Sequence, residues 1–389
     1  MNRRFFASLL IVVAPLVLFA ARTSGDNSKA AQYFAFIGTY TAKTDSKGIY
    51  SFHFDSSTGH LTSMAVAATT PDPSFLTVAH NDKYLYAVNE LSEFGGKKSG
   101  AVTSYSIDAR SGKLVQLNQV ASGGADPCYV SFDQSGKYLL VANYTGGSVS
   151  TFPIAADGRI GPVATFVQHT GYGPNKERQE GPHAHYIATS ADNRFVFVVD
   201  LGLDEVAVYR FDPATGSLTP NDSPFAKLAP GAGPRHLAFH PNGKFAYVLN
   251  EVIPTVSALA YDSKSGSFST LQTLSTIPKD FTAQNDTAEI VVHPSGKFLY
   301  VSNRGHDSIA EFTIDPAKGT LTLAGDFPTQ GKTPRNFAMD PTGKFLLAAN
   351  QESNNIVIFR IDQSTGALVA TGQVAQVPAP VDIVFVPVK

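Results

Sequence analysis

The sequence predicts an all-β protein, a seven-bladed β-propeller whose ring is closed by pairing of the N- and C-terminal strands. A short apolar run, a turn ending in Gly-Lys-aromatic or a close variant, and a second apolar run recur along the chain, as in residues 234–251. The basic residues of these turns lie 47 to 57 residues apart, at Lys83, Lys137, Arg194, Lys244, Lys297 and Lys344. A period near fifty with strand-like content is typical of radially repeated sheets.

The individual strands follow from the copies taken in order. First strands are expected to begin at Pro73, Pro127, Ala184, Pro234, Thr287, Pro334 and Pro380. A third apolar element follows each pair, as in residues 205–212 and 308–315. The last copy stops before its turn, and residues 34–40 resemble the missing second strand, so the two ends of the chain should complete one blade. Alternating apolar positions and Gly, Asp, Asn and Ser turns indicate antiparallel strands in seven four-stranded blades.

The N-terminus predicts a cleaved signal peptide over residues 1–21. Arg3 and Arg4 precede an apolar run from Phe5 to Ala20, which ends in small residues. An uncleaved membrane anchor is the alternative, but this run is interrupted by Pro15 and is shorter than the roughly 20 residues that span a bilayer. We therefore expect a periplasmic or secreted protein without stable membrane association, and the choice between the general and twin-arginine export routes stays open.

Composition restricts the remaining organisation. Cys128 is the only cysteine, so no internal disulfide can form, although export would permit one. A net charge of −2 gives no broad basic surface, which makes nucleic acid an unsuitable partner. No break in composition divides residues 30–389, so we expect one propeller domain. A closed ring leaves only protected strand edges, which predicts a monomer.

The hairpin geometry predicts which residues share a face. Residues just before each first strand lie beside those just after the second strand, at the end opposite the Gly-Lys turn. The first variable position reads Ser74, Cys128, His185, Arg235, Ala288, Arg335 and Val381, and the next reads Phe75, Tyr129, Tyr186, His236, Glu289, Asn336 and Asp382. Half of this ring is apolar or small and the other half is charged. Polar side chains that gather in a concave surface are typical of ligand sites, so this pattern predicts a small-molecule site at one side of the channel mouth.

Expected registers place specific pairs together at this mouth. Arg235 should lie opposite Asn250 and beside Glu251, His185 opposite Asp200, and Glu289 close to Ser302. An insertion over residues 169–185, rich in Gly and charge, precedes the strand that carries His185 and is placed to cover the mouth. The alternative is a solvated loop without a role. A second loop, residues 90–98, offers Lys97 and Lys98, for which plain solvation is the simpler interpretation.

At these residues the chain resembles the lactonase family of seven-bladed propellers, which includes bacterial 6-phosphogluconolactonases and fungal carboxymuconate-lactonizing enzymes. The resemblance covers essentially the whole mature chain and rests on residues 36–41, 142–144, 180–185, 233–236, 249–251 and 302–304. It implies a catalytic set of His185, Arg235, Glu251 and Arg304, without a metal or organic cofactor. Candidate substrate contacts on the same face are Arg178, His183, His236, Asn250, Glu289, Asn303 and Arg335.

This set suits the opening of a lactone by water. The reaction needs a base, for which His185 and Glu251 are both candidates, and cations such as Arg235 and Arg304 to hold the developing oxyanion. Asp200 near His185 would fix the tautomer of the ring. Each role has a plainer alternative: Arg235 and Glu251 can form a structural ion pair, and Cys128 is best explained as a small packed residue. His183 and His185 would face the same side of a strand, but no third metal ligand accompanies them.

Three functions therefore follow from the sequence. The first is hydrolysis of a small-molecule lactone, most simply 6-phospho-D-glucono-1,5-lactone, or an unphosphorylated lactone if the protein is exported. The second is a propeller that binds a ligand or protein without catalysis, because a fold does not fix a function. The third is lactone formation or isomerisation on a muconate.

Overall fold

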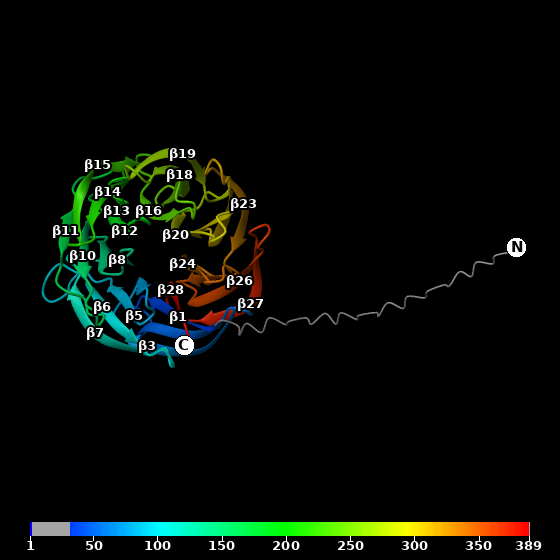
Figure 1. The fold of residues 1–389 in the computed structure, drawn as a ribbon, viewed down its shortest axis with the longest axis horizontal. Helices are drawn as coiled ribbons and strands as arrows, with labels where there is room; N and C mark the ends of the chain where they lie inside the picture. The colour runs from blue at the N-terminus through cyan, green and yellow to red at the C-terminus, as the bar shows by residue number, and fades with distance from the viewer. Residues whose placement is uncertain (2–31, 389) are drawn as a thin grey trace.

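The structure is a computed structural model that describes residues 32–388 together with Met1. Its strands form seven four-stranded antiparallel sheets arranged as a ring, through which the chain runs in order from blue to red (Figure 1). The expected seven-bladed propeller is thus confirmed. The predicted signal peptide, residues 1–21, lies outside the described residues apart from Met1. Among the residues described, no helix is long and apolar enough to cross a membrane.

The blades are numbered here from the first complete one. Blade 1 contains β4 (Leu76–Val78), β5 (Tyr84–Asn89), β6 (Ala101–Ile107) and β7 (Leu114–Ala121). Blade 2 contains β8 (Pro127–Phe132), β9 (Tyr138–Asn143), β10 (Ser148–Pro153) and β11 (Thr165–Gln168). Blade 3 contains β12 (Ala184–Thr189), β13 (Phe195–Asp200), β14 (Glu205–Asp212) and β15 (Ser217–Lys227).

The second half of the ring repeats this arrangement. Blade 4 contains β16 (Pro234–Phe239), β17 (Phe245–Asn250), β18 (Thr255–Asp262) and β19 (Ser267–Ser275). Blade 5 contains β20 (Asp286–Val292), β21 (Phe298–Arg304), β22 (Ser308–Ile314) and β23 (Leu321–Pro328). Blade 6 contains β24 (Pro334–Met339), β25 (Phe345–Asn350), β26 (Asn355–Ile361) and β27 (Leu368–Gln376).

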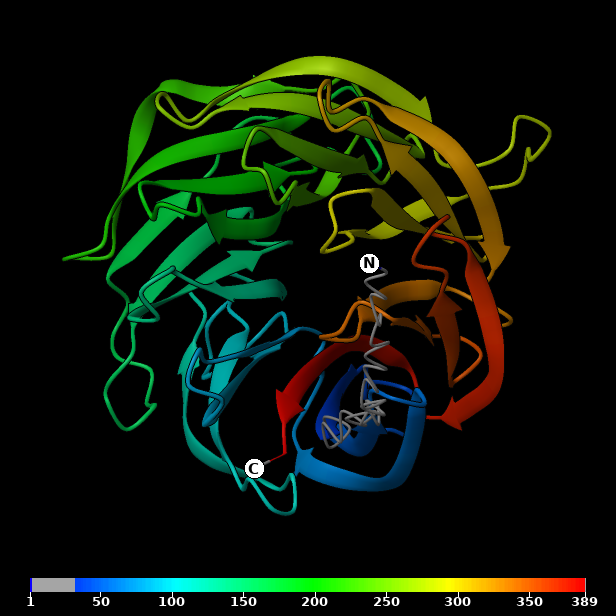
Figure 2. The ribbon, with the colours of Figure 1, turned by 45° about the vertical axis from the view of Figure 1, so that its right-hand side comes forward.

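Blade 7 closes the ring with both ends of the chain. It contains β28 (Pro380–Pro387), β1 (Gln32–Thr39), β2 (Gly48–Asp55) and β3 (His60–Thr69). β1 and β28 pair antiparallel, with Phe36 opposite Val384, and Figure 2 shows the red C-terminal strand beside the blue N-terminal strands. The expected joint blade is therefore present, and backbone hydrogen bonds between β1 and β28 hold the ring closed.

Aromatic side chains join neighbouring blades, and all of them are Phe, Tyr or His, because the sequence contains no tryptophan. Tyr86 and Tyr300 are fully buried. The Tyr86 hydroxyl donates to the carbonyl of Gly158, at 2.8 Å, and that of Tyr300 to Gly366, at 2.6 Å, and each bond crosses to the following blade. These tyrosines bury a large apolar ring and satisfy its polar tip at once.

A β-bulge at the start of the innermost strands positions the site. The register shifts between Pro127 and Tyr129, and equivalent shifts occur in β12, β16, β20 and β24. Consequently Pro234, not Arg235, pairs with Asn250, and Ala184, not His185, pairs with Asp200. These two expected registers were one residue off, because a bulged residue stands outside the ladder and its side chain is re-aimed. The expected proximity of Glu289 to Ser302 is confirmed, since the backbone N–H of Glu289 donates to the Ser302 hydroxyl, at 2.9 Å.

Candidate active site

Two rings of side chains surround the channel mouth. The mouth ring consists of the residues that directly follow the second strand of each blade or, in blade 5, end it, namely Tyr40, Glu90, Tyr144, Leu201, Glu251, Arg304 and Gln351. The bulge ring consists of the residues at the shifted positions and their equivalents, namely Ser74, Cys128, His185, Arg235, Ala288, Arg335 and Val381. Members of both rings and of the insertion enclose a cavity of about 310 Å³, lined by Glu90, Cys128, Tyr144, Arg178, His185, Glu251, Asp286, Arg304 and Arg335.

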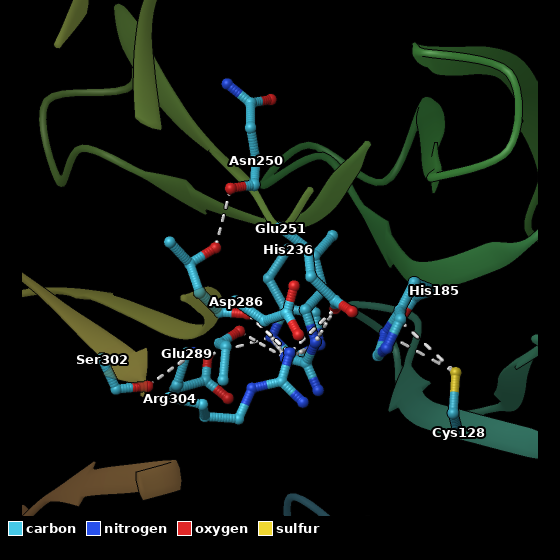
Figure 3. Close-up of polar contacts among 12 residues, drawn as sticks. Cys128, His185, His236, Asn250, Glu251, Asp286, Glu289, Ser302 and Arg304 are labelled. Atoms are coloured by element: carbon cyan, nitrogen blue, oxygen red, sulfur yellow. Dashed lines mark hydrogen bonds and ion pairs between the residues drawn. The ribbon is translucent and has the colours of Figure 1, made fainter. Parts of the chain in front are cut away.

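Three arginines form ion pairs with Glu251 at one side of this cavity. Glu251 and one of them, Arg304, are labelled in Figure 3. Its Oε1 lies 2.5 Å from Nη2 of Arg178. Its Oε2 lies 3.0 Å from Nε of Arg235 and 3.2 Å from Nη2 of Arg304. Burial disfavours the carboxylate, but the three cations outweigh burial and lower the pKa of Glu251 to about 2. Because both oxygens are engaged and the group is ionised, Glu251 is a poor proton acceptor at neutral pH.

The arginines are themselves fixed by the backbone of β20. Arg235 donates from Nη1 to the carbonyl of Ala288, and Arg304 donates from Nη2 to that of Thr287, at 2.8 Å. Burial and the neighbouring Arg335 lower the pKa of Arg235 to about 10, so it remains charged at neutral pH. These buried, oriented cations form a preorganised site for negative charge.

His185 lies on the other side of the cavity, beside Cys128 (Figure 3). Its Nδ1 is 3.6 Å from the Cys128 sulfur, and its ring packs edge-on against Tyr144 and His236. Burial, followed by the charge of Arg235, holds the pKa of His185 well below its usual range. The imidazole is therefore neutral and able to accept a proton. Of the two bases left open by the sequence, the electrostatics favour His185.

Asp200 does not orient His185, contrary to expectation. Its carboxylate lies 2.6 Å from Nδ1 of His169 and accepts a hydrogen bond from the backbone N–H of His183, at 2.8 Å. Tyr209 completes this cluster, with its hydroxyl 2.9 Å from Nε2 of His169. The bulge turns His185 towards the channel, while Asp200 holds both ends of the insertion.

The insertion forms part of the cavity wall. Gln179 is fully buried and donates to the carbonyl of Leu201, at 2.9 Å, and to Asp204, at 2.7 Å. This anchor lets the half-buried Arg178 reach Glu251 and approach Asp286, 3.6 Å away. Lys97 and Lys98 of the other loop are exposed and do not line the cavity.

A second layer of side chains lies beneath the cavity. Tyr129 packs on Phe75 and Tyr186, with ring centroids 4.2 and 4.6 Å apart, and on His236 across the channel, at 5.1 Å. Glu289 accepts from Asn336, at 2.9 Å, and contacts His236, at 3.1 Å. A hollow of only about 10 Å³, comparable to one water, remains between the two layers.

Comparison with known proteins shows to which family the chain belongs. Residues 34–385 match the family described as "Lactonase, 7-bladed beta-propeller". The chain belongs to this lactonase family. It is 40% identical over 309 residues to a 6-phosphogluconolactonase of Bacillus subtilis (strain 168), covering 79% of this chain and 85% of the relative.

Solved structures extend the similarity. A putative 6-phosphogluconolactonase of Bacteroides fragilis has 38% identity and a TM-score of 0.86, with 92% of this chain and 99% of that one covered. The periplasmic gluconolactonase PpgL of Pseudomonas aeruginosa has 36% identity and a TM-score of 0.86, with coverage of 92% and 100%. The similarity therefore extends over whole propellers and is not limited to one motif.

Within this lactonase fold, the predicted catalytic set comes together. Glu251 contacts both Arg235 and Arg304, and His185 lines the same cavity. Of the candidate substrate contacts, Arg178 and Arg335 line the cavity, while His236 and Glu289 lie in the layer beneath it.

The other three candidate contacts support the walls. His183 stacks on Tyr144, with centroids 4.5 Å apart. Asn250 points away from Glu251 (Figure 3) and donates to Thr255, at 2.9 Å, and Asn303 donates to the carbonyl of Thr276, at 3.0 Å. The Asn repeated at strand ends is therefore explained by hydrogen bonds to neighbouring strands and loops.

Sequence reasoning missed Glu90, Tyr144 and Asp286 as parts of the cavity. A signal for Glu90 was present, because it follows Asn89 as Glu251 follows Asn250 in the repeat. Cys128 also lines the cavity, but burial raises the pKa of its thiol, which leaves it neutral and unsuited to nucleophilic attack. Within residues 32–388 no group of three or more His, Cys, Asp or Glu is placed to hold a metal.

Proposed function

We propose that the chain hydrolyses a sugar lactone, with 6-phospho-D-glucono-1,5-lactone as the first candidate substrate. The observation that carries the proposal is the cavity itself. Arginines held in place by hydrogen bonds and a neutral histidine, His185, line the same cavity of about 310 Å³. That volume is at the small end of ligand sites and suits a six-membered sugar ring. The named relatives support the same class of substrate.

The roles follow from the electrostatics. Arg235 and Arg304 stabilise the negative charge that develops on the carbonyl oxygen, as preorganised cations do. His185 takes a proton from the attacking water and returns it to the ring oxygen when the C–O bond of the lactone breaks. One water is consumed and one hydroxy acid is formed. Glu251 keeps the arginines in place and does not itself transfer the proton.

The charge balance also addresses the muconate alternative. Four arginines surround the cavity and its base, but four carboxyl groups, Glu90, Glu251, Asp286 and Glu289, match them in number. A substrate with two or three carboxylates would find few free cations, whereas a lactone with one anionic group, or none, fits this balance.

Export bears on the choice of lactone. We propose that the chain acts in the periplasm or as a secreted monomer, because its N-terminus has the features of a signal peptide. Phosphorylated sugar lactones arise inside cells, so an unphosphorylated aldonolactone is the second candidate. The similarity to a protein named periplasmic gluconolactonase favours this candidate.

The test is hydrolysis of 6-phosphogluconolactone and of glucono-1,5-lactone by the purified protein, corrected for spontaneous opening. Arg235→Lys should lower kcat at least tenfold, because a point charge does not replace a fixed guanidinium. Arg210→Lys, an exposed arginine, is the matched control. Undiminished turnover in a folded Arg235→Lys variant contradicts the assigned role. Absence of turnover on both lactones contradicts the proposed function and leaves a binding propeller.

A further inference from the structure

Glu90 is a second buried carboxylate at the cavity, in a different environment from Glu251. It occupies the same repeat position as Glu251, in blade 1 and not in blade 4, and lines both the cavity and the hollow beneath it. Among the described residues it takes part in no ion pair shorter than 4 Å. Its partners are hydroxyl groups.

Those hydroxyl groups donate hydrogen bonds to the carboxylate but do not occupy all of its acceptor positions. The Tyr40 hydroxyl lies 3.0 and 2.9 Å from its two oxygens, and Ser74 donates to Oε2. An ionised carboxylate offers about four acceptor positions. The hydroxyl protons of Tyr40 and Ser74 fill two of them, so about two remain unfilled when the group is ionised.

Arg335 supports this arrangement from one side. Its guanidinium lies over the Tyr40 ring, 5.2 Å from the centroid. Burial opposes its charge, but Tyr40, Glu90 and Glu251 outweigh burial and raise the pKa of Arg335. It therefore remains a cation near Glu90 and offsets part of the cost of burying that carboxylate. Burial, the largest influence, still raises the pKa of Glu90, while Arg335 and the two hydroxyl groups oppose that shift.

The cavity is consequently asymmetric. At one side Glu251 is surrounded by guanidinium groups, and little acceptor capacity remains there. Glu90 lines the same cavity, with hydroxyl groups in place of guanidinium groups as its side-chain partners. Hydroxyl groups of a sugar are donors that match such a carboxylate, and a charge-assisted hydrogen bond is stronger than a neutral one.

We propose that Glu90 is a specificity-determining residue that accepts hydrogen bonds from ring hydroxyls of the substrate and so selects polyhydroxylated lactones. This inference rests on the proposed lactone hydrolysis. A site built to pair with hydroxyl groups rejects analogues that lack them, because its buried acceptor is then left unpaired. The carbonyl lies towards Arg235 and Arg304, and the hydroxyl-bearing carbons lie towards Glu90.

The experiment compares glucono-1,5-lactone with δ-valerolactone, which has the same ring without hydroxyls. kcat and KM are measured for the unaltered protein, Glu90→Gln, and Glu93→Gln, an exposed glutamate on the same loop that serves as control. Glu90→Gln should lower kcat/KM for gluconolactone by about 10- to 100-fold, mainly through KM. Its effect on δ-valerolactone should be less than about threefold, and Glu93→Gln should change neither.

An equal loss on both lactones, or a loss in kcat alone, overturns the inference, since it assigns Glu90 to catalysis or to folding. No loss on either lactone overturns it as well. If Glu90→Gln does not fold, Glu90→Asp retains the charge, withdraws the carboxylate by one methylene, and should show the same selective loss.

Failure of the proposed function is recognised separately. If the unaltered protein opens neither lactone, calorimetric binding of D-gluconate to it and to Glu90→Gln decides the role of Glu90. Binding at least tenfold weaker in the variant supports hydroxyl recognition. Equal binding, or none, overturns it.

Discussion

Replacing Glu251 by Gln removes the one negative charge shared by three arginines, and the structure sets the cost. The pKa of this carboxyl is lowered from 4.5 to about 2, and each pKa unit corresponds to about 1.36 kcal/mol. The carboxylate therefore contributes about 3 kcal/mol at neutral pH, in the range of about 3 to 5 kcal/mol for breaking a buried ion pair. For a propeller of this size, with an unfolding entropy of roughly 0.75 kcal/mol per degree, the expected decrease in Tm is about 4 °C.

The stability contributed by the Glu251 carboxylate should depend on pH, in a direction set by its lowered pKa. A carboxyl whose folded pKa is depressed stabilises the fold above its unfolded pKa and loses that contribution as pH falls towards its folded pKa. The difference between the unaltered protein and Glu251→Gln should thus be full above pH 5 and should shrink between pH 4.5 and about 2. Urea unfolding at pH 7 and pH 3 measures both values, and Glu352→Gln, an exposed glutamate, is the control.

Two results would refute this reasoning. A loss below about 1 kcal/mol at pH 7 would show that the arginines do not need the carboxylate. A loss of equal size at pH 7 and pH 3 would show that shape, not charge, stabilises the cluster.

Two further predictions concern titration. His185 acts as a base only when neutral, and burial holds its pKa well below 6.5. The acid limb of the kcat/KM profile should therefore be centred well below pH 6.5, and a limb centred at 6.5 or above would contradict the assignment. Glu311 is buried with one oxygen unpaired among the described residues, and burial raises its pKa from 4.5 to about 7. The folded protein therefore loses stability as pH rises from 4.5 to about 7. In urea unfolding, Glu311→Gln should stabilise the protein by about 2 to 3 kcal/mol at pH 8 but not at pH 4. The same gain at both values would exclude a charge effect.

Much of the architecture was predictable because it depends on local, repeated patterns. Period-two apolar runs and turn residues define strands, and recurrence near fifty residues implies blades. The truncated copy at Pro380 predicted the closing pair that joins Phe36 to Val384. The sequence also predicted at which end of the blades the candidate residues gather, because hairpin geometry alone places both ends of each copy on one face.

The sequence by itself determined the blade plan, the closure of the ring and the set of polar residues gathered at the mouth. The tertiary structure decided how those residues pair. The bulges shifted His185 and Arg235 by one position and turned them into the channel, and Asp200 bonded to His169 in place of His185. The hydroxyl-bound Glu90 likewise appeared only when blades 7 and 1 came together. Contacts between blades join residues far apart in the chain, and their geometry depends on side-chain direction and burial, which a period in the sequence does not specify.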